Sequence, residues 1–171
     1  IHADGVLTIS DGIIDITKSY EGLEGLQVII NNGDISIVSS DDGINSTATS
    51  GQGIVIDGGN LYILAGGDGL DSNSRTAYSG IVFKGGKTVV ISTSGGNSAI
   101  DTEAGYTYTS GSVLAIMPNG GMTSEATHCS NFSSVAKKIS MSLSSGKTLT
   151  VSVSNSAILS VKIPCNLSAI V

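Results

Sequence analysis

The sequence has little charge and few of the residues that restrict or cross-link a chain. Among 171 residues it has no tryptophan, two prolines, two cysteines and a single arginine, Arg75, and charged residues make up 13%. Because nucleic acids demand a basic surface, the net charge of −6 argues against them as partners and favours cations. No apolar run approaches the roughly 18 residues of a membrane-spanning helix. We therefore expect neither a nucleic-acid partner nor a membrane span.

Glycine and small polar residues dominate instead. The chain holds 23 glycines, and serine, threonine and asparagine carry most of its polarity. Few residues belong to the types that fill helix surfaces, so the composition predicts an all-β protein. A chain of this length suits one domain that buries roughly two-thirds of its unfolded surface. Neither a metal nor a disulfide is needed merely to fold it.

The cysteines and the first residue leave alternatives open. Cys129 and Cys165 either form a disulfide or remain two small buried thiols, and neither alternative indicates redox chemistry. No signal peptide is recognisable, and Ile1 already stands inside the repeat described next. We therefore expect a mature domain excised from a longer chain.

A short motif recurs along the first two-thirds of the sequence. The stretch GDGLDSN at 67–73 places an apolar residue between a glycine and an acidic residue, and EGLE, DGIN and the weaker SAID have the same shape. The apolar markers are separated by 22, 21, 26 and 30 residues, close to one coil of a solenoid. The markers are Ile1, Leu23, Ile44, Leu70 and Ile100.

A second pattern follows each motif. Over 7–16, an alternating apolar strand, an Asp-Gly corner and a second alternating strand follow one another, and the pattern recurs over 28–37 and 54–63. Looser copies follow over 83–90 and 108–115. Three short strands per period, with apolar residues inward and glycines at corners, predict a parallel β-helix.

The pattern changes towards the C-terminus. From Ile139 the apolar residues alternate, turn at Ser-Ser-Gly-Lys and alternate again, as in an antiparallel meander. A solenoid needs such a piece because its open end exposes a core and a strand edge. We therefore predict coils over 1–121 and an antiparallel β cap over 122–171.

Stacked coils convert the repeat into columns of side chains about 4.8 Å apart. Two carboxylates at this distance repel by about 1 kcal/mol in water and by several at a protein surface. Calcium–oxygen distances of about 2.4 Å place two ligands on opposite sides of one ion at the same spacing, which predicts bridging calcium ions. One column contains Glu24, Asn45, Asp71 and Asp101, with His2 at its end, and a second contains Glu21, Asp42, Asp68 and Ser98. The predicted ligands are Glu21, Glu24, Asp42, Asn45, Asp68 and Asp71, extended by Asp101 and His2.

Turn chemistry is the alternative explanation for these residues. Asp and Asn tolerate tight turns because their side chains bond to the local backbone. Glu21 and Glu24 are poor turn formers, yet they occupy the same columns. Their position favours calcium.

The serial motifs resemble those of a known group. IHADGVLTI, SYEGLEG, SDDGIN, GDGLDSN and AIDTEAG, followed by GGM and a serine-rich end, are similar to secreted bacterial carbohydrate-binding domains first characterised in cellulolytic clostridia. The resemblance implies a right-handed, pectate-lyase-like β-helix that is extracellular or on the cell surface. It further implies a calcium-bearing, non-catalytic module for plant cell-wall polysaccharide: acidic pectic chains such as polygalacturonate first, and cellulose as a second candidate. The cysteine pair and the SAID copy depart from the family pattern.

Two other functions remain open. A polysaccharide lyase shares this fold and needs an Arg or Lys base over its calcium, but the coils offer only Arg75 and the lysines Lys18, Lys84 and Lys87. A structural, adhesin-like surface module would bind nothing. Exposed tyrosines favour a binder, because sugar rings stack on them, although each ring has burial at a coil edge as its alternative. The candidate carbohydrate-binding tyrosines are Tyr20, Tyr78, Tyr106 and Tyr108.

Overall fold

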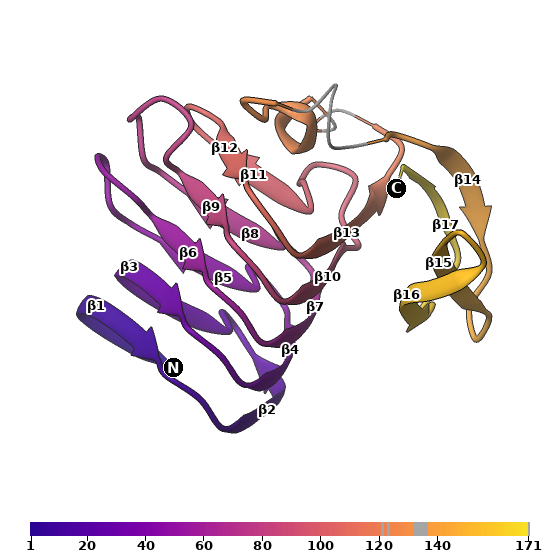
Figure 1. The fold of residues 1–171 in the computed structure, drawn as a ribbon, viewed down its shortest axis with the longest axis horizontal. Helices are drawn as coiled ribbons and strands as arrows, with labels where there is room; N and C mark the ends of the chain where they lie inside the picture. Colours follow the sequence, from indigo (N-terminus) through magenta and orange to yellow (C-terminus); the bar gives the residue numbers. More distant parts are fainter. Residues whose placement is uncertain (121, 123, 132–136, 171) are drawn as a thin grey trace.

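The chain folds into a parallel β-solenoid followed by an antiparallel segment (Figure 1). The computed structural model describes every residue except 121, 123, 132–136 and 171. Strands account for 53% of the chain and helix for 2%, and the parallel strands form about four coils. The predicted all-β parallel β-helix with an antiparallel C-terminal element is therefore confirmed. The predicted boundary at residue 121 lies outside the described residues.

Each coil contributes strands at three positions. The first two positions form one sheet, sheet A, and the third forms the parallel part of a second sheet, sheet B. In the first two coils one long strand spans both positions of sheet A: β1 (His2–Ile9) and β3 (Leu23–Ile30). The later coils have β5 (Ile44–Ser46), β8 (Leu70–Ser72) and β11 (Ile100–Thr102) at the first position and β6 (Ile54–Ile56), β9 (Ile81–Phe83) and β12 (Tyr106–Tyr108) at the second. Sheet B contains β2 (Ile13–Ser19), β4 (Asp34–Ser39), β7 (Asn60–Ala65), β10 (Lys87–Ser92) and β13 (Ser112–Pro118).

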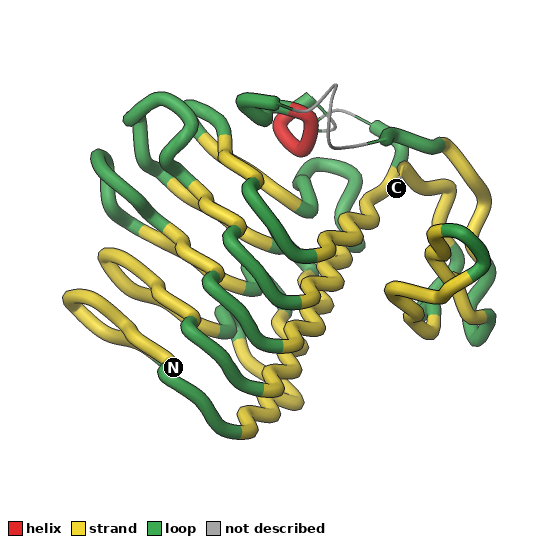
Figure 2. Tube along the Cα trace, in the orientation of Figure 1, coloured by secondary structure: helices red, strands yellow, loops and turns green. Residues whose placement is uncertain are grey.

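Loops account for the lengthening repeat. In β3 the chain passes from the first position to the second without interruption, whereas segments 47–53 and 73–80 separate these positions in later coils. The loops project from one corner of the coils, where Figure 2 shows them as stacked green segments. The insertion 47–53 lengthens the third coil, whereas in the fourth coil most of the further lengthening comes from segment 93–99 after β10, and neither insertion changes how the strands pair.

The core lies between the sheets and consists of stacked aliphatic side chains. Leu23 pairs with Ile44, Ile44 with Leu70, and Leu70 with Ile100, as the repeat predicts. All four side chains are at most 2% exposed. Burying one such side chain stabilises the fold by about 1.5–3 kcal/mol.

The glycine of each motif allows the coils to approach one another. A Cβ atom at Gly43 would collide with the carbonyl oxygen of Gly69 and the side chain of Ile63. The same position in the last copy of the motif is Ala99, in the coil whose first strand, β11, forms the edge of sheet A. The departure in SAID therefore has a steric explanation, because no further sheet A strand stacks on this coil.

The antiparallel segment covers the side of the solenoid more than its end. Strand β17 (Leu167–Ile170) pairs with the edge strand β13 and with β14 (Ser140–Leu143). The hairpin of β15 (Thr148–Val153) and β16 (Ser156–Lys162) packs its apolar side chains against the outer face of sheet B. At the end of the coils lies the short 3-10 helix η1 (Glu125–Thr127), where Ala126 joins the solenoid core. The predicted cap is thus antiparallel, but its hairpin lies against a face of the solenoid.

The cysteines are unpaired. Cys129 lies beside β12, where its backbone forms an isolated parallel β-bridge with Tyr106. Cys165 packs with the cluster under the hairpin. Of the two alternatives, the structure contains free thiols, both partly exposed. No helix in the described part of the chain is long and apolar enough to cross a membrane.

Candidate functional site

The structure places the predicted acidic columns side by side on sheet A. In the first column, the residue after each apolar marker faces outward and pairs in register with its counterpart in the next coil. We call the two columns together the carboxylate ladder. The first column contains His2, Glu24, Asn45, Asp71 and Asp101 in spatial order, and the second contains Glu21, Asp42 and Asp68.

The second column lies at the corner that leads into sheet A. The Asp42 carboxylate accepts a hydrogen bond of 2.7 Å from the backbone N–H of Asp68, and the Asp68 carboxylate accepts one from the N–H of Ser98. The side chain of Asn97 also donates to Asp68, over 3.2 Å. Each aspartate therefore reaches into the next coil. Ser98 is fully buried and donates its hydroxyl to the carbonyl of Ile100, so it ends the column without facing the ladder.

Burial and mutual repulsion raise the pKa of the ladder carboxyls. Burial, with repulsion from Asp42 and Asp101 as the next causes, raises the pKa of Asp71 to about 7. Burial likewise raises the pKa values of Asp42 and Asp101 to about 6, with smaller repulsive contributions from neighbouring carboxylates. The pKa values of Glu21 and Asp68 are also raised, mainly by burial. Without a cation, the ladder therefore carries negative charge at a free-energy cost near neutral pH.

Two oxygens of the ladder are buried and have no hydrogen-bond partner among the described residues. The amide of Asn45 donates to Glu21 Oε1 over 3.3 Å, which leaves Glu21 Oε2 and Asn45 Oδ1 unpaired. An unpaired buried acceptor typically costs about 1–3 kcal/mol. An ordered water or a cation can supply a partner to such acceptors.

His2 closes the N-terminal end of the ladder as a hydrogen-bonded side chain. Its Nδ1 lies 2.7 Å from Glu24 Oε2 and its Nε2 lies 3.1 Å from Asp4 Oδ1. Hydrogen bonds to Asp4 and then Glu24 raise the pKa of the exposed imidazole. Both ring nitrogens are engaged, so this arrangement suits a protonated counter-ion for Glu24 better than a metal ligand.

Among the residues that the structure describes, no lysine or arginine forms an ion pair with the ladder. Within the described residues the ion pairs are those of His2 with Asp4 and Glu24, and that of Lys84 with Asp57 at 3.0 Å. In the same part of the chain, no group of three or more His, Cys, Asp or Glu side chains is already arranged around a metal position. Calcium would therefore draw on amide and backbone oxygens and on small movements of the carboxylates.

The four candidate tyrosines divide into two pairs. Tyr20 is 71% exposed beside the ladder, where its hydroxyl interacts with Asp41, and Tyr78 is 41% exposed with its ring edge against His128. Tyr106 is buried against Phe83 and donates its hydroxyl to the carbonyl of Ala126. Tyr108 packs against the core and donates to the carbonyl of Gly111. The expectation that Tyr106 presents its ring to a sugar is not compatible with this burial, whereas Tyr108 is only partly buried and keeps part of its surface accessible.

Sequence reasoning missed two residues beside the ladder. Asp41 interacts with Tyr20 and contributes to the raised pKa of Asp68, and Asn97 binds Asp68 directly. The Asp-Asp doublet at 41–42 was a visible signal for the first. Nothing in the repeat marks Asn97, which lies in a longer loop before the last motif.

Comparisons with known proteins identify no relative: no protein family, curated protein or solved structure matches the chain.

Proposed function

We propose that this protein is a non-catalytic, calcium-binding module that binds an acidic polysaccharide through the carboxylate ladder. The carrying observation is the in-register stack of acidic side chains with no lysine or arginine paired to it among the described residues. Natural proteins rarely keep like charges together on stacked strands without a counter-ion. The resemblance to clostridial carbohydrate-binding domains supports the same function.

The donor atoms fit calcium better than a transition metal. The ladder offers only carboxylate and amide oxygens away from His2, and hard cations such as calcium prefer such ligands. Glu21 Oε2 and Asn45 Oδ1 are the two acceptors without partners, and Asp71 lies next to Asn45 in the same column. Glu21, Asn45 and Asp71 are therefore the proposed centre of the site, with Asp42, Asp68, Glu24 and Asp101 completing the ladder.

Calcium resolves an apparent conflict of charge. A protein with a net charge of −6 repels a polyuronate at long range. A bound calcium ion with an open coordination position reverses the local charge and accepts a uronate carboxylate. Tyr20, exposed beside the ladder, offers a ring face for the sugar.

The arrangement of basic residues supports binding without cleavage. A lyase needs a strong base over its metal, but Lys84 pairs with Asp57 at the opposite corner of its coil and Lys87 lies on sheet B. Lys18 also lies on sheet B, in β2, and Arg75 lies in the loop 73–80 and forms no ion pair with the ladder among the described residues. We therefore favour the binding module over the lyase.

Affinity electrophoresis on polygalacturonate tests this function. We expect retardation in calcium, loss of retardation in EDTA, and weaker binding by Asp68→Ala and Asp71→Ala, while Asp11→Asn, an exposed carboxylate outside the ladder, behaves as wild type. The ultraviolet absorbance of unsaturated product should stay flat. Retardation that persists in EDTA would remove the ladder from polysaccharide binding, and rising absorbance would establish a lyase.

A further inference from the structure

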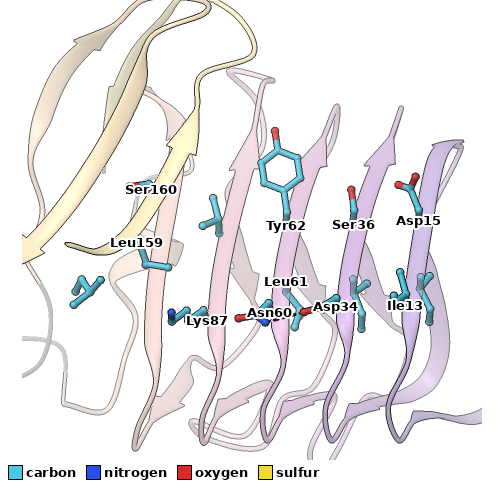
Figure 3. A pocket seen from close by; sticks show the side chains of 14 residues that line it. Ile13, Asp15, Asp34, Ser36, Asn60, Leu61, Tyr62, Lys87, Leu159 and Ser160 are labelled. Carbon is cyan, nitrogen blue, oxygen red and sulfur yellow. Dashed lines mark hydrogen bonds between the residues drawn. The ribbon is translucent and has the colours of Figure 1, made fainter. Parts of the chain in front are cut away.

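A groove of about 670 Å³ crosses the outer face of sheet B (Figure 3). Strands β2, β4, β7 and β10 form its floor, and β16 forms one wall through Leu159 and Ser160. The hairpin covers the outer face near β10 and β13 but leaves the far end open, where Ile13 is 85% exposed. The groove is on a different sheet from the carboxylate ladder.

One row of the floor carries hydrogen-bonding groups of different kinds. Asp34, Asn60 and Lys87 pair in register on successive strands. The Asn60 amide donates to Asp34 Oδ1 over 2.7 Å, which fixes the orientation of the amide. Asn60 and Asp34 are exposed and each has a further acceptor oxygen, and the exposed Lys87 on the next strand carries an ammonium that donates. This row can therefore both donate to and accept from one ligand.

The second row adds an aromatic surface. Asp15, Ser36 and Tyr62 follow one another in register, and Figure 3 shows the Tyr62 ring standing up from the floor. The ring is half-buried against the cluster under the hairpin, which holds it in place. Ile13 and Leu159 extend the apolar surface on either side.

These features together select the ligand chemistry. The groove is lined by two carboxylates, Asp15 and Asp34, and by one lysine, Lys87. Its net negative charge therefore repels a polyanion at close range. A sugar ring has apolar faces for Tyr62 and hydroxyls that both donate and accept, and ligand sites commonly combine an apolar lining with a few placed polar groups. Because the rows cross four strands in an open groove, a linear chain can extend over successive coils.

We infer that the groove binds a neutral polysaccharide chain, without calcium, through Tyr62, Asn60, Asp34 and Lys87. This site is separate from the ladder proposed for acidic chains, and neither depends on the other. The protein would then have two polysaccharide sites of opposite chemical preference on two faces of one solenoid.

Affinity electrophoresis in EDTA tests the groove, with hydroxyethylcellulose, arabinoxylan and galactomannan as probes. We expect at least one of them to retard the wild-type protein. Tyr62→Ala and Asn60→Ala should weaken that binding by about tenfold or more, which corresponds to about 1.4 kcal/mol. Tyr62→Phe keeps the ring and should bind nearly as wild type. Lys147→Ala, which changes an exposed lysine in the turn between β14 and β15, outside the groove, is the matched control.

The outcomes separate the two proposals. If none of the three polymers retards the protein, or if both alanine variants bind as wild type, the groove proposal is overturned. Retardation by a neutral polymer that requires calcium also overturns it, because binding would then belong to the ladder. Should Tyr62→Ala fail to fold, as its melting curve would show, Asn60→Ala at an exposed position decides the test.

Discussion

At the residue scale, Asp71 is the position where burial and repulsion act most strongly in the ladder. Its carboxyl is partly buried and lies between Asn45 and Asp101 in its column, and its pKa is raised to about 7, above the values of about 6 for Asp42 and Asp101. The same carboxylate that destabilises the metal-free protein should be needed to hold a cation. Its two roles can be separated by one isosteric substitution.

Asp71→Asn should therefore stabilise the metal-free protein and abolish its stabilisation by calcium. The gain should be about 1 kcal/mol, less than full linkage predicts because the group is partly exposed. Thermal unfolding in EDTA and in calcium measures both effects. Asp11→Asn is the control. A lower melting temperature for Asp71→Asn than for wild type in EDTA would show that the Asp71 charge does not destabilise the metal-free protein.

Gly43 should be irreplaceable by alanine for steric reasons. The added Cβ would meet the Gly69 carbonyl oxygen and Ile63, and both belong to the packed interface between coils. We expect Gly43→Ala to lower the free energy of unfolding by about 1–3 kcal/mol, as overpacking does. Urea denaturation measures it. Gly95→Ala, where a Cβ meets nothing within 4 Å, should change little, and equal effects at the two sites would contradict this packing account.

At the element scale, the ladder makes stability depend on pH in an unusual direction. Asp42, Asp71 and Asp101 have folded pKa values of about 6, 7 and 6, above the unfolded value of about 3.9. Between about pH 4 and 7 the folded state thus binds more protons than the unfolded state, so stability falls as pH rises. Metal-free protein should melt at a lower temperature at about pH 8 than at about pH 5. Calcium should reduce this difference, and a stability that rises with pH in metal-free buffer would contradict the raised pKa values.

The repeat predicted the sheet A ladder well because stacking forces equivalent residues into register. The markers Leu23, Ile44, Leu70 and Ile100 needed only their spacing, since one face of each strand must be buried. Where the period ends, this constraint ends as well. The alternation after Ile139 predicted antiparallel strands but contained nothing to say which face of the solenoid the hairpin covers.

The individual tyrosines could not be assigned from sequence for a similar reason. Tyr106 and Tyr108 lie in the last coil. There the core packs against Ala126 of η1 and against Cys129, and not against another coil. The closing contact, Tyr106 hydroxyl to Ala126 carbonyl, joins segments 20 residues apart that share no motif. The groove on sheet B was missed because most of its polar residues occupy the outward positions of alternating strands. Such positions face solvent in most strands, so the sequence pattern did not distinguish them.

At the scale of the whole molecule, charge is divided unevenly along the chain. All acidic residues occur between Asp4 and Glu125, whereas the last 46 residues contain four lysines and no acidic residue. The solenoid is therefore more acidic than the net charge of −6 suggests, and six of its carboxylates lie in the ladder. Bound cations would offset the repulsion within this acidic surface and so stabilise the folded protein at neutral pH.

Calorimetric titration of calcium into the metal-free protein tests this central claim most directly. We expect saturable binding of at least one ion per chain, lost in Asp71→Asn and retained in Asp11→Asn. The affinity should strengthen as the pH rises through about 6 to 7, because the ligands must lose protons. Absence of saturable heat up to about millimolar calcium, the weak limit of protein calcium sites, would contradict it.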